Sequence, residues 1–324
     1  MMRRNTTRTA TATPGRRPEG GGRFAIWLIR DAARLFGRRF VRAFLYPITL
    51  YFYLRRGVER RASAAYLARI GRPAGRLAVL AHLHAFASVV LDRVFLLTCG
   101  FAPFDIRVHG YEQLQAQLER GGGAMLLGAH VGSFETLNVL KQERPQLVLK
   151  FVMDKLQTQA CNGLLYSLNP DVGAQIIEVG SDPVDFALQL QAVAQGGGVI
   201  GLLGDRIRAG ELAVSAPFLG APADFPAAPY LIASMLKLPI VLGFGIYRGG
   251  NRYDLHFELF AAELRIERGQ RDAQLRAAAQ RYAARLEHYL RTAPYNWFNF
   301  HDFWQRAAAV PGVDAGRLAD RAAA

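Results

Sequence analysis

Strands alternate with helices from about residue 105 onward, and this alternation restricts the possible fold more than any other feature of the sequence. Short apolar runs separated by longer helical patterns predict crossover units and a parallel sheet. The predicted strands are Asp105–Val108, Ala124–Gly128, Leu147–Val152, Gln175–Val179, Val199–Leu203, Pro239–Ile246 and Tyr253–Leu259. The predicted helices cover residues 111–120, 133–143, 156–168, 183–195, 227–237 and 269–292. We therefore expect an α/β fold with a mixed, largely parallel sheet flanked by helices.

The excess positive charge is confined to the N-terminal end of the chain. The formal net charge is +14, and residues 1–72 hold 17 arginines with only three acidic residues. The rest of the chain is neutral overall, so a neutral body follows a basic front end. Such a front end suits an anionic partner: a lipid surface, a nucleic acid or an acidic protein.

Composition divides the chain into four parts. Residues 1–22 are polar and lack the apolar region of a secretory signal, so we expect a disordered basic tail. Residues 23–72 form an amphipathic, basic docking segment, residues 73–310 the main domain, and residues 311–324 a flexible tail. Hydrophobic residues make up 51% of the chain, which excludes a disordered or fibrous protein, and two cysteines cannot form a disulfide framework.

The docking segment contains an uncharged stretch, Ala43–Leu54, that is rich in aromatic residues and includes Pro47. It is too short to span a bilayer, which takes about 20 apolar residues. Its aromatics suit the membrane interface, whereas the simpler alternative is an aromatic helix packed on the domain; one segment can do both. A second uncharged run, Leu77–Leu91, contains two histidines and favours a buried helix.

His130 stands at the point where a buried predicted strand gives way to a turn and a helix. Open α/β sheets present ligand-binding residues beyond the carboxyl ends of their strands. Glu135, in the first turn of the expected helix, is placed to hydrogen-bond the imidazole and fix its tautomer. The other ring nitrogen would then accept a proton from a hydroxyl. Five-residue spacing of this kind also arises by chance, so a structural histidine is the alternative.

A second buried strand ends at Gly204-Asp205-Arg206. Arg206 is suited to hold a phosphate or carboxylate, and the alternative is a surface ion pair with Asp205. Further on, residues 217–230 are rich in proline, alanine and phenylalanine, as expected of an apolar wall or loop over a hydrophobic site. Residues 293–304 are strongly aromatic and favour core packing over the lining of an acyl pocket.

Several motifs in order resemble one known family. His130-x4-Glu135, Gly204-Asp205-Arg206 and Pro217-Phe218-Leu219-Gly220 are similar to blocks of the lysophospholipid acyltransferase superfamily. The closest likeness is to its bacterial lipid A biosynthesis branch, including relatives found with aryl-polyene pigment pathways. The stretches LYPITLYFYLRR, RRASAAYL and PYNWFNF extend the resemblance from about Leu45 to Trp304.

The resemblance implies a glycerol-3-phosphate acyltransferase-like fold and an O-acyltransferase at the cytoplasmic face of the inner membrane. The fatty acyl chain would pass from acyl carrier protein or coenzyme A directly to a hydroxyl of a lipid or glycolipid. His130 would be the general base with Glu135 as its partner, while Arg206 and Asp205 would bind substrate. The amides of Gly132 and Ser133, at a helix N-terminus, would bind the oxyanion.

Other activities remain as alternatives. A non-catalytic protein that docks on a membrane or nucleic acid would explain the charge but not the motifs, and no nucleic-acid-binding signature occurs. A hydrolase of the same thioesters differs only in whether water or an alcohol attacks. No zinc or calcium motif occurs, and His82 and His84 face different directions on a helix, so we expect no metal and no cofactor besides the acyl donor.

Overall fold

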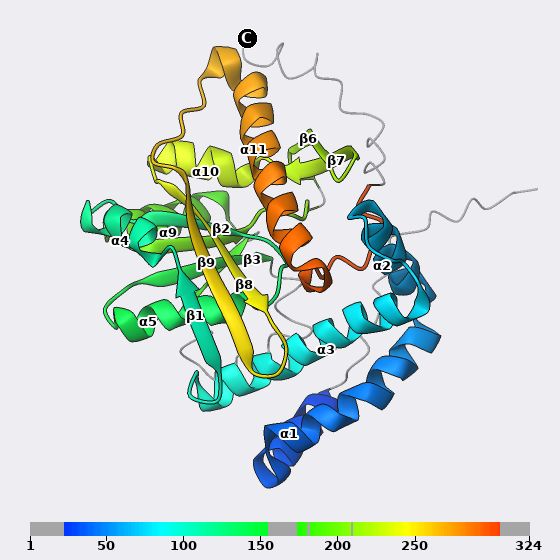
Figure 1. Ribbon diagram of the computed structural model, residues 1–324. Helices are drawn as coiled ribbons and strands as arrows, with labels where there is room; N and C mark the ends of the chain where they lie inside the picture. The colour runs from blue at the N-terminus through cyan, green and yellow to red at the C-terminus, as the bar shows by residue number, and fades with distance from the viewer. Residues whose placement is uncertain (1–22, 155–173, 180–181, 209, 305–324) are drawn as a thin grey trace, which may run out of the picture.

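The computed structural model describes residues 23–154, 174–179, 182–208 and 210–304. Three predicted segments lie outside the described residues: the two tails, residues 1–22 and 311–324, and the helix 156–168. Figure 1 shows a central sheet with helices on its faces and three N-terminal helices at one end. The expected α/β fold is confirmed.

The sheet has seven strands in the order β1-β9-β8-β2-β5-β3-β4. Every neighbouring pair is parallel except β8 with β9, so the sheet is mixed and largely parallel. Its strands are β1 (Asp105–His109), β2 (Ala124–Gly128), β3 (Leu149–Asp154), β4 (Ile176–Val179), β5 (Val199–Leu203), β8 (Ile240–Tyr247) and β9 (Arg252–Ala261).

Three helices precede strands of this sheet and a fourth follows its last strand, all close to the predicted positions. They are α4 (Tyr111–Glu119), α9 (Pro183–Gln195), α10 (Ala228–Leu236) and α11 (Arg271–Thr292). The N-terminus of α9 has the expected proline in its first turn, and the Asp182 carboxylate caps it by accepting from the amide of Val184 at 2.8 Å. The predicted helix 133–143 is instead a 3-10 helix, η1 (Phe134–Val139), followed by the short α5 (Leu140–Glu143).

The segment expected to be an apolar wall or loop, residues 217–230, overlaps an antiparallel hairpin of β6 (Ala213–Phe218) and β7 (Ala221–Pro226). The turn between the two strands consists of Leu219 and Gly220, and both residues have a positive φ. Alternate residues of β6 are buried, and the hairpin packs against α11 (Figure 1). Of the two expected forms, the loop is thus replaced by a hairpin over most of this stretch, and its phenylalanines Phe218 and Phe225 are buried in the core.

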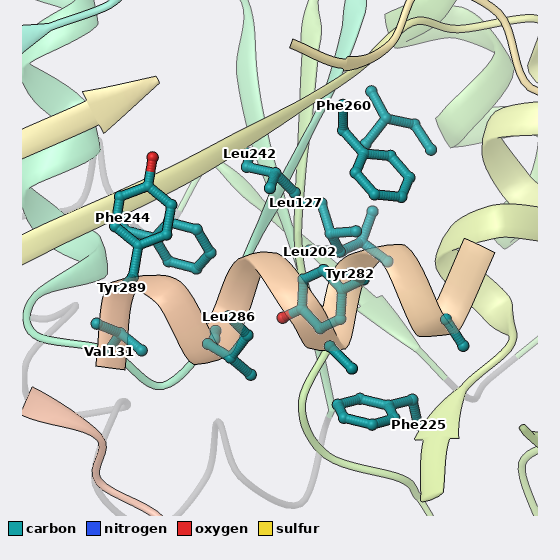
Figure 2. Packing of buried hydrophobic residues seen from close by; sticks show 14 of the residues in the cluster. Leu127, Val131, Leu202, Phe225, Leu242, Phe244, Phe260, Tyr282, Leu286 and Tyr289 are labelled. Carbon is teal, nitrogen blue, oxygen red and sulfur yellow. The ribbon is translucent and has the colours of Figure 1, made fainter. Parts of the chain in front are cut away.

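The core lies on both faces of the sheet because its central strands are buried on both sides. In β2, Met125 and Leu127 pack in the larger cluster, whereas Leu126 packs in the smaller one on the opposite face. On the larger side α11 lies across the strands, with Tyr282 and Leu286 fully buried (Figure 2). This two-sided burial holds the carboxyl ends of the central strands in a fixed register.

Three helices precede the sheet: α1 (Arg23–Arg55), α2 (Gly57–Arg69) and α3 (Arg76–Cys99). The first contains a break at Gly37, which has a φ of 76°. Along α1, the buried residues Val41, Leu45 and Thr49 recur every four positions, and the first two pack on α3. By length and composition α3 is apolar enough to cross a membrane, but 61% of its most apolar window is buried, as in a core helix.

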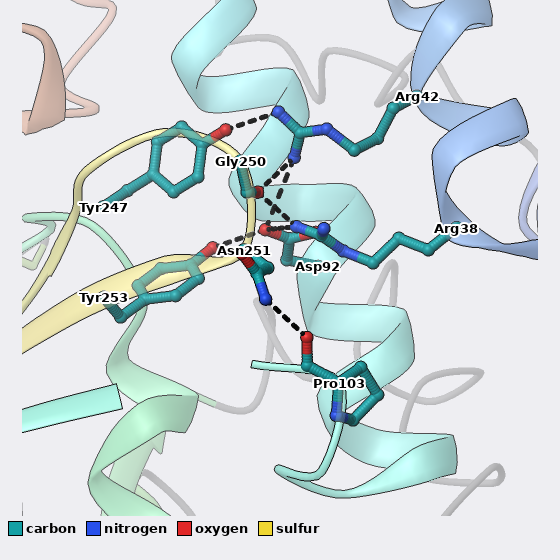
Figure 3. A network of polar contacts seen from close by, with 8 residues as sticks. All are labelled: Arg38, Arg42, Asp92, Pro103, Tyr247, Gly250, Asn251 and Tyr253. Carbon is teal, nitrogen blue, oxygen red and sulfur yellow. Dashed lines mark hydrogen bonds and ion pairs between the residues drawn. The ribbon is translucent and has the colours of Figure 1, made fainter. Parts of the chain in front are cut away.

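A polar network joins α1 to the rest of the protein (Figure 3). The Asp92 carboxylate on α3 is fully buried and accepts from Arg38 Nε and Nη2 at 2.8 and 2.7 Å and from the Tyr253 hydroxyl at 2.9 Å. Arg42 donates to the Tyr247 hydroxyl at 2.6 Å and to the carbonyl of Gly250 at 2.8 Å. Arg38 and Arg42 are thus both directed into the body of the protein.

Candidate active site

Two loops meet beyond the carboxyl ends of β2 and β5. These strands pair in parallel with Gly128 opposite Leu203. His130 and Asp205 each lie two residues beyond the end of their strand, so the register of the sheet places them side by side. Such a position is where open α/β sheets hold their ligands.

The imidazole of His130 is oriented by Asp205. Its Nδ1 lies 2.8 Å from Asp205 Oδ1, and its backbone amide donates to Oδ2 at 3.0 Å. The His130 side chain is 22% exposed, whereas the Asp205 carboxylate is fully buried. Within the described residues, Nε2 of His130 has no hydrogen-bond partner.

Asp205 is held as a carboxylate by several N–H donors. Besides the two from His130, it accepts from Trp297 Nε1 at 2.9 Å and from Asn299 Nδ2 at 2.8 Å. Burial alone would raise the pKa of Asp205, but His130 and Arg206 hold it well below its usual value. Because an ionised carboxylate only accepts hydrogen bonds, the proton of the imidazole sits on Nδ1 and the lone pair on Nε2.

Burial also decides the charge of His130. It lowers the pKa of the imidazole, and the nearby Arg206 guanidinium acts in the same direction, against the opposing effect of Asp205. The imidazole is therefore neutral at neutral pH, with Nε2 ready to accept a proton. This is the state that a general base requires.

Arg206 lies beside this pair and is tied to the C-terminal aromatic stretch. Its Nε donates to Asn299 Oδ1 at 2.6 Å, and its Nη2 donates to the carbonyl of Phe298 at 2.9 Å. The surface ion pair considered as an alternative is not what the structure shows, because Asp205 is buried beneath His130. Within the described part of the chain, Nη1 of Arg206 has no hydrogen-bond partner.

Glu135 does not pair with His130 in this structure. Its carboxylate accepts from the Ser133 hydroxyl at 3.1 Å and forms an ion pair with Arg93 Nε on α3 at 2.5 Å. The predicted partnership thus differs from the observed one, in which Asp205 takes the place expected for Glu135. The reason is local: η1 directs the Glu135 side chain toward α3, whereas the imidazole turns toward β5.

The backbone amides of Gly132 and Ser133, predicted to bind the oxyanion, already donate hydrogen bonds within the protein. Gly132 N donates to the carbonyl of Asn296 and Ser133 N to the carbonyl of Gly245, both at 2.8 Å. The loop runs as an extra strand-like segment between β8 and the aromatic stretch. Gly132 has a φ of 59°, and a Cβ there would collide with the Gly245 carbonyl, so the loop is clamped in place.

A cavity of about 710 Å³ begins at Glu135 and extends along η1 and α5. Asn138, Lys141 and Gln142 follow on the same side of these helices. The C-terminal end of α3 and the first residues of β3 supply most of its apolar lining: Leu96, Leu97, Phe101, Leu147, Val148 and Leu149. Most of the cavity lining is therefore apolar, and Glu135 is the one residue of the predicted site that contributes to it.

The sequence did not reveal the support that residues 297–301 give to the site. Trp297 is fully buried, which confirms the core-packing interpretation, yet its indole N–H also binds Asp205. Asn299 bridges Asp205 and Arg206, and His301 lies close enough for these charges to influence its pKa. Two asparagines within an otherwise aromatic run were the available signal.

A comparison with known families gives one match: the model of bacterial lipid A biosynthesis acyltransferases fits residues 97–306, about two thirds of the chain. The chain belongs to this acyltransferase family. The resemblance drawn from the motifs is thereby confirmed, and the protein is an O-acyltransferase acting on a lipid acceptor. The matched region of this acyltransferase includes both strands that carry the site and the aromatic stretch behind it. A comparison with curated proteins gave no match.

Proposed function

We propose that the protein transfers a fatty acyl chain from an acyl thioester, carried by acyl carrier protein or coenzyme A, to a hydroxyl of a glycolipid of the lipid A type. One observation supports the proposed reaction. The His130 imidazole is fixed by a buried carboxylate on one nitrogen and leaves the other nitrogen unpartnered within the described residues. This arrangement is that of a general base acting on a hydroxyl.

In the proposed reaction, Nε2 of His130 takes the proton of the acceptor hydroxyl as its oxygen attacks the thioester carbonyl carbon. The new C–O bond gives a tetrahedral oxyanion. Its collapse breaks the C–S bond, and the imidazolium returns the proton to the leaving thiolate. Asp205 stabilises the transient imidazolium, so no covalent acyl-enzyme is needed.

The oxyanion or a phosphate of the substrate is assigned to Arg206. Because the amides of Gly132 and Ser133 already donate within the protein, they do not serve as donors here. The guanidinium lies beside the imidazole, and Asn299 and Phe298 fix its orientation while Nη1 stays available. A preorganised cation of this kind stabilises negative charge without rearrangement during the reaction.

The cavity next to Glu135 suits the acyl chain of the donor. Its volume of about 710 Å³ lies in the usual range for small-molecule sites, about 300–1,000 Å³. Residues of η1 and α5 line it together with Leu147 and Gln175. A thioester placed near His130 would direct its hydrocarbon chain into this apolar space. Glu135 then belongs to the lining of the chain pocket.

A bulky side chain in the lining of this cavity should shorten the preferred acyl chain. We expect Leu147→Trp to lower kcat/KM for the longest accepted donor by about tenfold or more, because a pocket that cannot seat terminal methylenes loses their binding energy. Rates with shorter donors should change little. A series of acyl thioesters of increasing length measures the profile. Leu212→Trp, at a half-exposed position outside the cavity, is the matched control. An unchanged profile in Leu147→Trp would remove the cavity from the mechanism.

The exposed side of α1 supports docking on the membrane. Away from the residues buried against α3, it presents exposed apolar and aromatic side chains: Phe44, Leu50, Tyr51 and Leu54, flanked by Ile48 and by Tyr46, whose ring stacks on His84. Such a stripe, next to an arginine-rich sequence, is typical of a helix lying in the headgroup region of an anionic bilayer. We place the enzyme on the cytoplasmic face of the inner membrane, where lipid acceptors are within reach.

The function is tested by supplying the purified protein with a radiolabelled acyl thioester and vesicles that contain a lipid A precursor. We expect label in the lipid, and more of it with anionic than with neutral vesicles. Release of free fatty acid at the same rate without acceptor would identify a hydrolase. Binding to DNA with no lipid product would favour a docking protein instead.

A further inference from the structure

Two histidines and one aspartate form a cluster on the neighbouring strands β1 and β9. His109 lies directly opposite His256 in the parallel register, and Asp254 is two residues before His256 on the same face of β9. One ligand atom from each of the three lies within 4.8 Å of the others. The cluster is on strands that do not carry His130 or Asp205, so the proposed reaction does not use it.

The two imidazoles are stacked on each other, and the His256 ring also lies against the ring of Tyr289. Their ring centroids are 4.7 Å apart and their planes differ by 16°. Among the described residues, neither ring makes a hydrogen bond, and Nε2 of His256 is buried without a partner. A buried ring nitrogen left in this way costs free energy unless something binds it.

Asp254 is already oriented for a role as a ligand. Its Oδ2 accepts from Arg248 Nε at 2.7 Å, and this contact fixes the carboxylate while Oδ1 stays available. Carboxylates and imidazoles that bind metals are commonly held by such outer hydrogen bonds.

We propose that His109, Asp254 and His256 bind a divalent transition metal ion, with Zn²⁺ as the probe. Two imidazole nitrogens and a carboxylate oxygen suit Zn²⁺ and its neighbours rather than Mg²⁺ or Ca²⁺, which prefer oxygen ligands. With bonds of about 2.0–2.1 Å in a tetrahedral site, neighbouring ligand atoms stand about 3.3 Å apart. In the stacked arrangement the two lone pairs do not point at one ion, so metal binding would require the exposed His109 side chain to rotate and the His256 ring to turn. Three protein ligands leave the fourth position to water.

The position of the site indicates what the ion would do. β1 is an edge strand whose only sheet neighbour among the described strands is β9, and the ligands are shared between the two. The ion would fasten this edge strand to the sheet. The three ligands are far apart in sequence, which is why no metal motif is visible and none was expected from the sequence.

The test uses the untagged full-length protein, stripped with a chelator and titrated with Zn²⁺ by calorimetry. We expect one equivalent to bind and the melting temperature to rise with Zn²⁺ concentration. His109→Ala and Asp254→Asn should each weaken binding by on the order of tenfold or more. Co²⁺ should give the visible absorption of a tetrahedral site in the parent protein and lose it in both variants.

The matched control is His288→Ala, an exposed histidine on the neighbouring helix α11. It should keep the Zn²⁺ affinity and the Co²⁺ spectrum of the parent protein. Because the His109 side chain is exposed, its removal leaves the fold intact and keeps the test valid if a His256 variant fails to fold. Equal affinity in His109→Ala, Asp254→Asn and the parent protein, or an equal loss in His288→Ala, would overturn the proposal.

Discussion

Replacing His130 with alanine should slow acyl transfer by about 10²–10⁴-fold, the range in which a general base contributes. The loss should fall on kcat more than on KM, because the imidazole acts when the hydroxyl is deprotonated and not when the donor binds. The variant should still fold, since the buried Asp205 carboxylate keeps the N–H donors of the residue 130 amide, Trp297 and Asn299. Initial rates of label transfer to lipid, measured at several donor concentrations, give both constants.

Added imidazole provides a sharper test of the same residue. If His130 acts through its Nε2 lone pair, free imidazole entering the space left in His130→Ala should restore part of the rate. His288→Ala, which removes an exposed histidine of α11, serves as the control and should transfer label at the parent rate. Full activity of His130→Ala would exclude the proposed base.

Asp205→Asn should be nearly as damaging as the loss of His130, with a decrease of about 10³–10⁴-fold in kcat. The asparagine oxygen can still accept from the amide of His130 and from Trp297, so the loop should stay in place. Its NH₂ group, however, would face Nδ1 of His130 and donate to it. The imidazole proton would then move to Nε2, and the ring would present an N–H to the hydroxyl instead of a lone pair.

The pH profile separates this mechanism from a merely structural effect. In the parent protein, burial lowers the pKa of His130, so kcat/KM should rise with pH through a value below 6.5 and then level off. Loss of the Asp205 charge removes an interaction that favours imidazolium, so the acid limb should move to still lower pH. Glu135→Gln should leave the acid limb where it is, because Glu135 contacts Ser133 and Arg93. A shifted limb in Glu135→Gln but not in Asp205→Asn would restore the pairing first expected from the sequence.

Much of the fold followed from local patterns. The bounds of β2, β5 and α9 coincide with the predicted ones, because each is delimited by glycines, a capping aspartate or a proline. The hairpin of β6 and β7 was missed because Pro217 and Pro222 interrupt the alternation that marks a strand. Prolines are tolerated in such a two-stranded ribbon, where a strand has an outer edge without partners.

The sequence predicted the positions of the site residues but not how they pair. The position of His130 beyond a buried strand was visible, and so was Asp205 beyond another. Their pairing depends on the adjacency of β2 and β5 in the sheet, which no local pattern encodes. Spacing along the chain therefore favoured Glu135 as the partner of the imidazole. The hydrogen bonds that Trp297 and Asn299 donate to Asp205 likewise depend on tertiary contacts, because these residues lie more than 90 positions further along the chain.

The network around Asp92 bears on how the protein would meet a bilayer. Arg38 and Arg42 are among the arginines that give the chain its basic front end, yet their guanidinium groups are occupied by Asp92, Tyr247 and Gly250 (Figure 3). They contribute little to lipid binding and instead lock α1 against the hairpin between β8 and β9. A bilayer that takes up the outer side of α1 would therefore fix the tilt of the whole molecule. The distance from His130 to the lipid surface becomes a property of the fold, set before any substrate arrives.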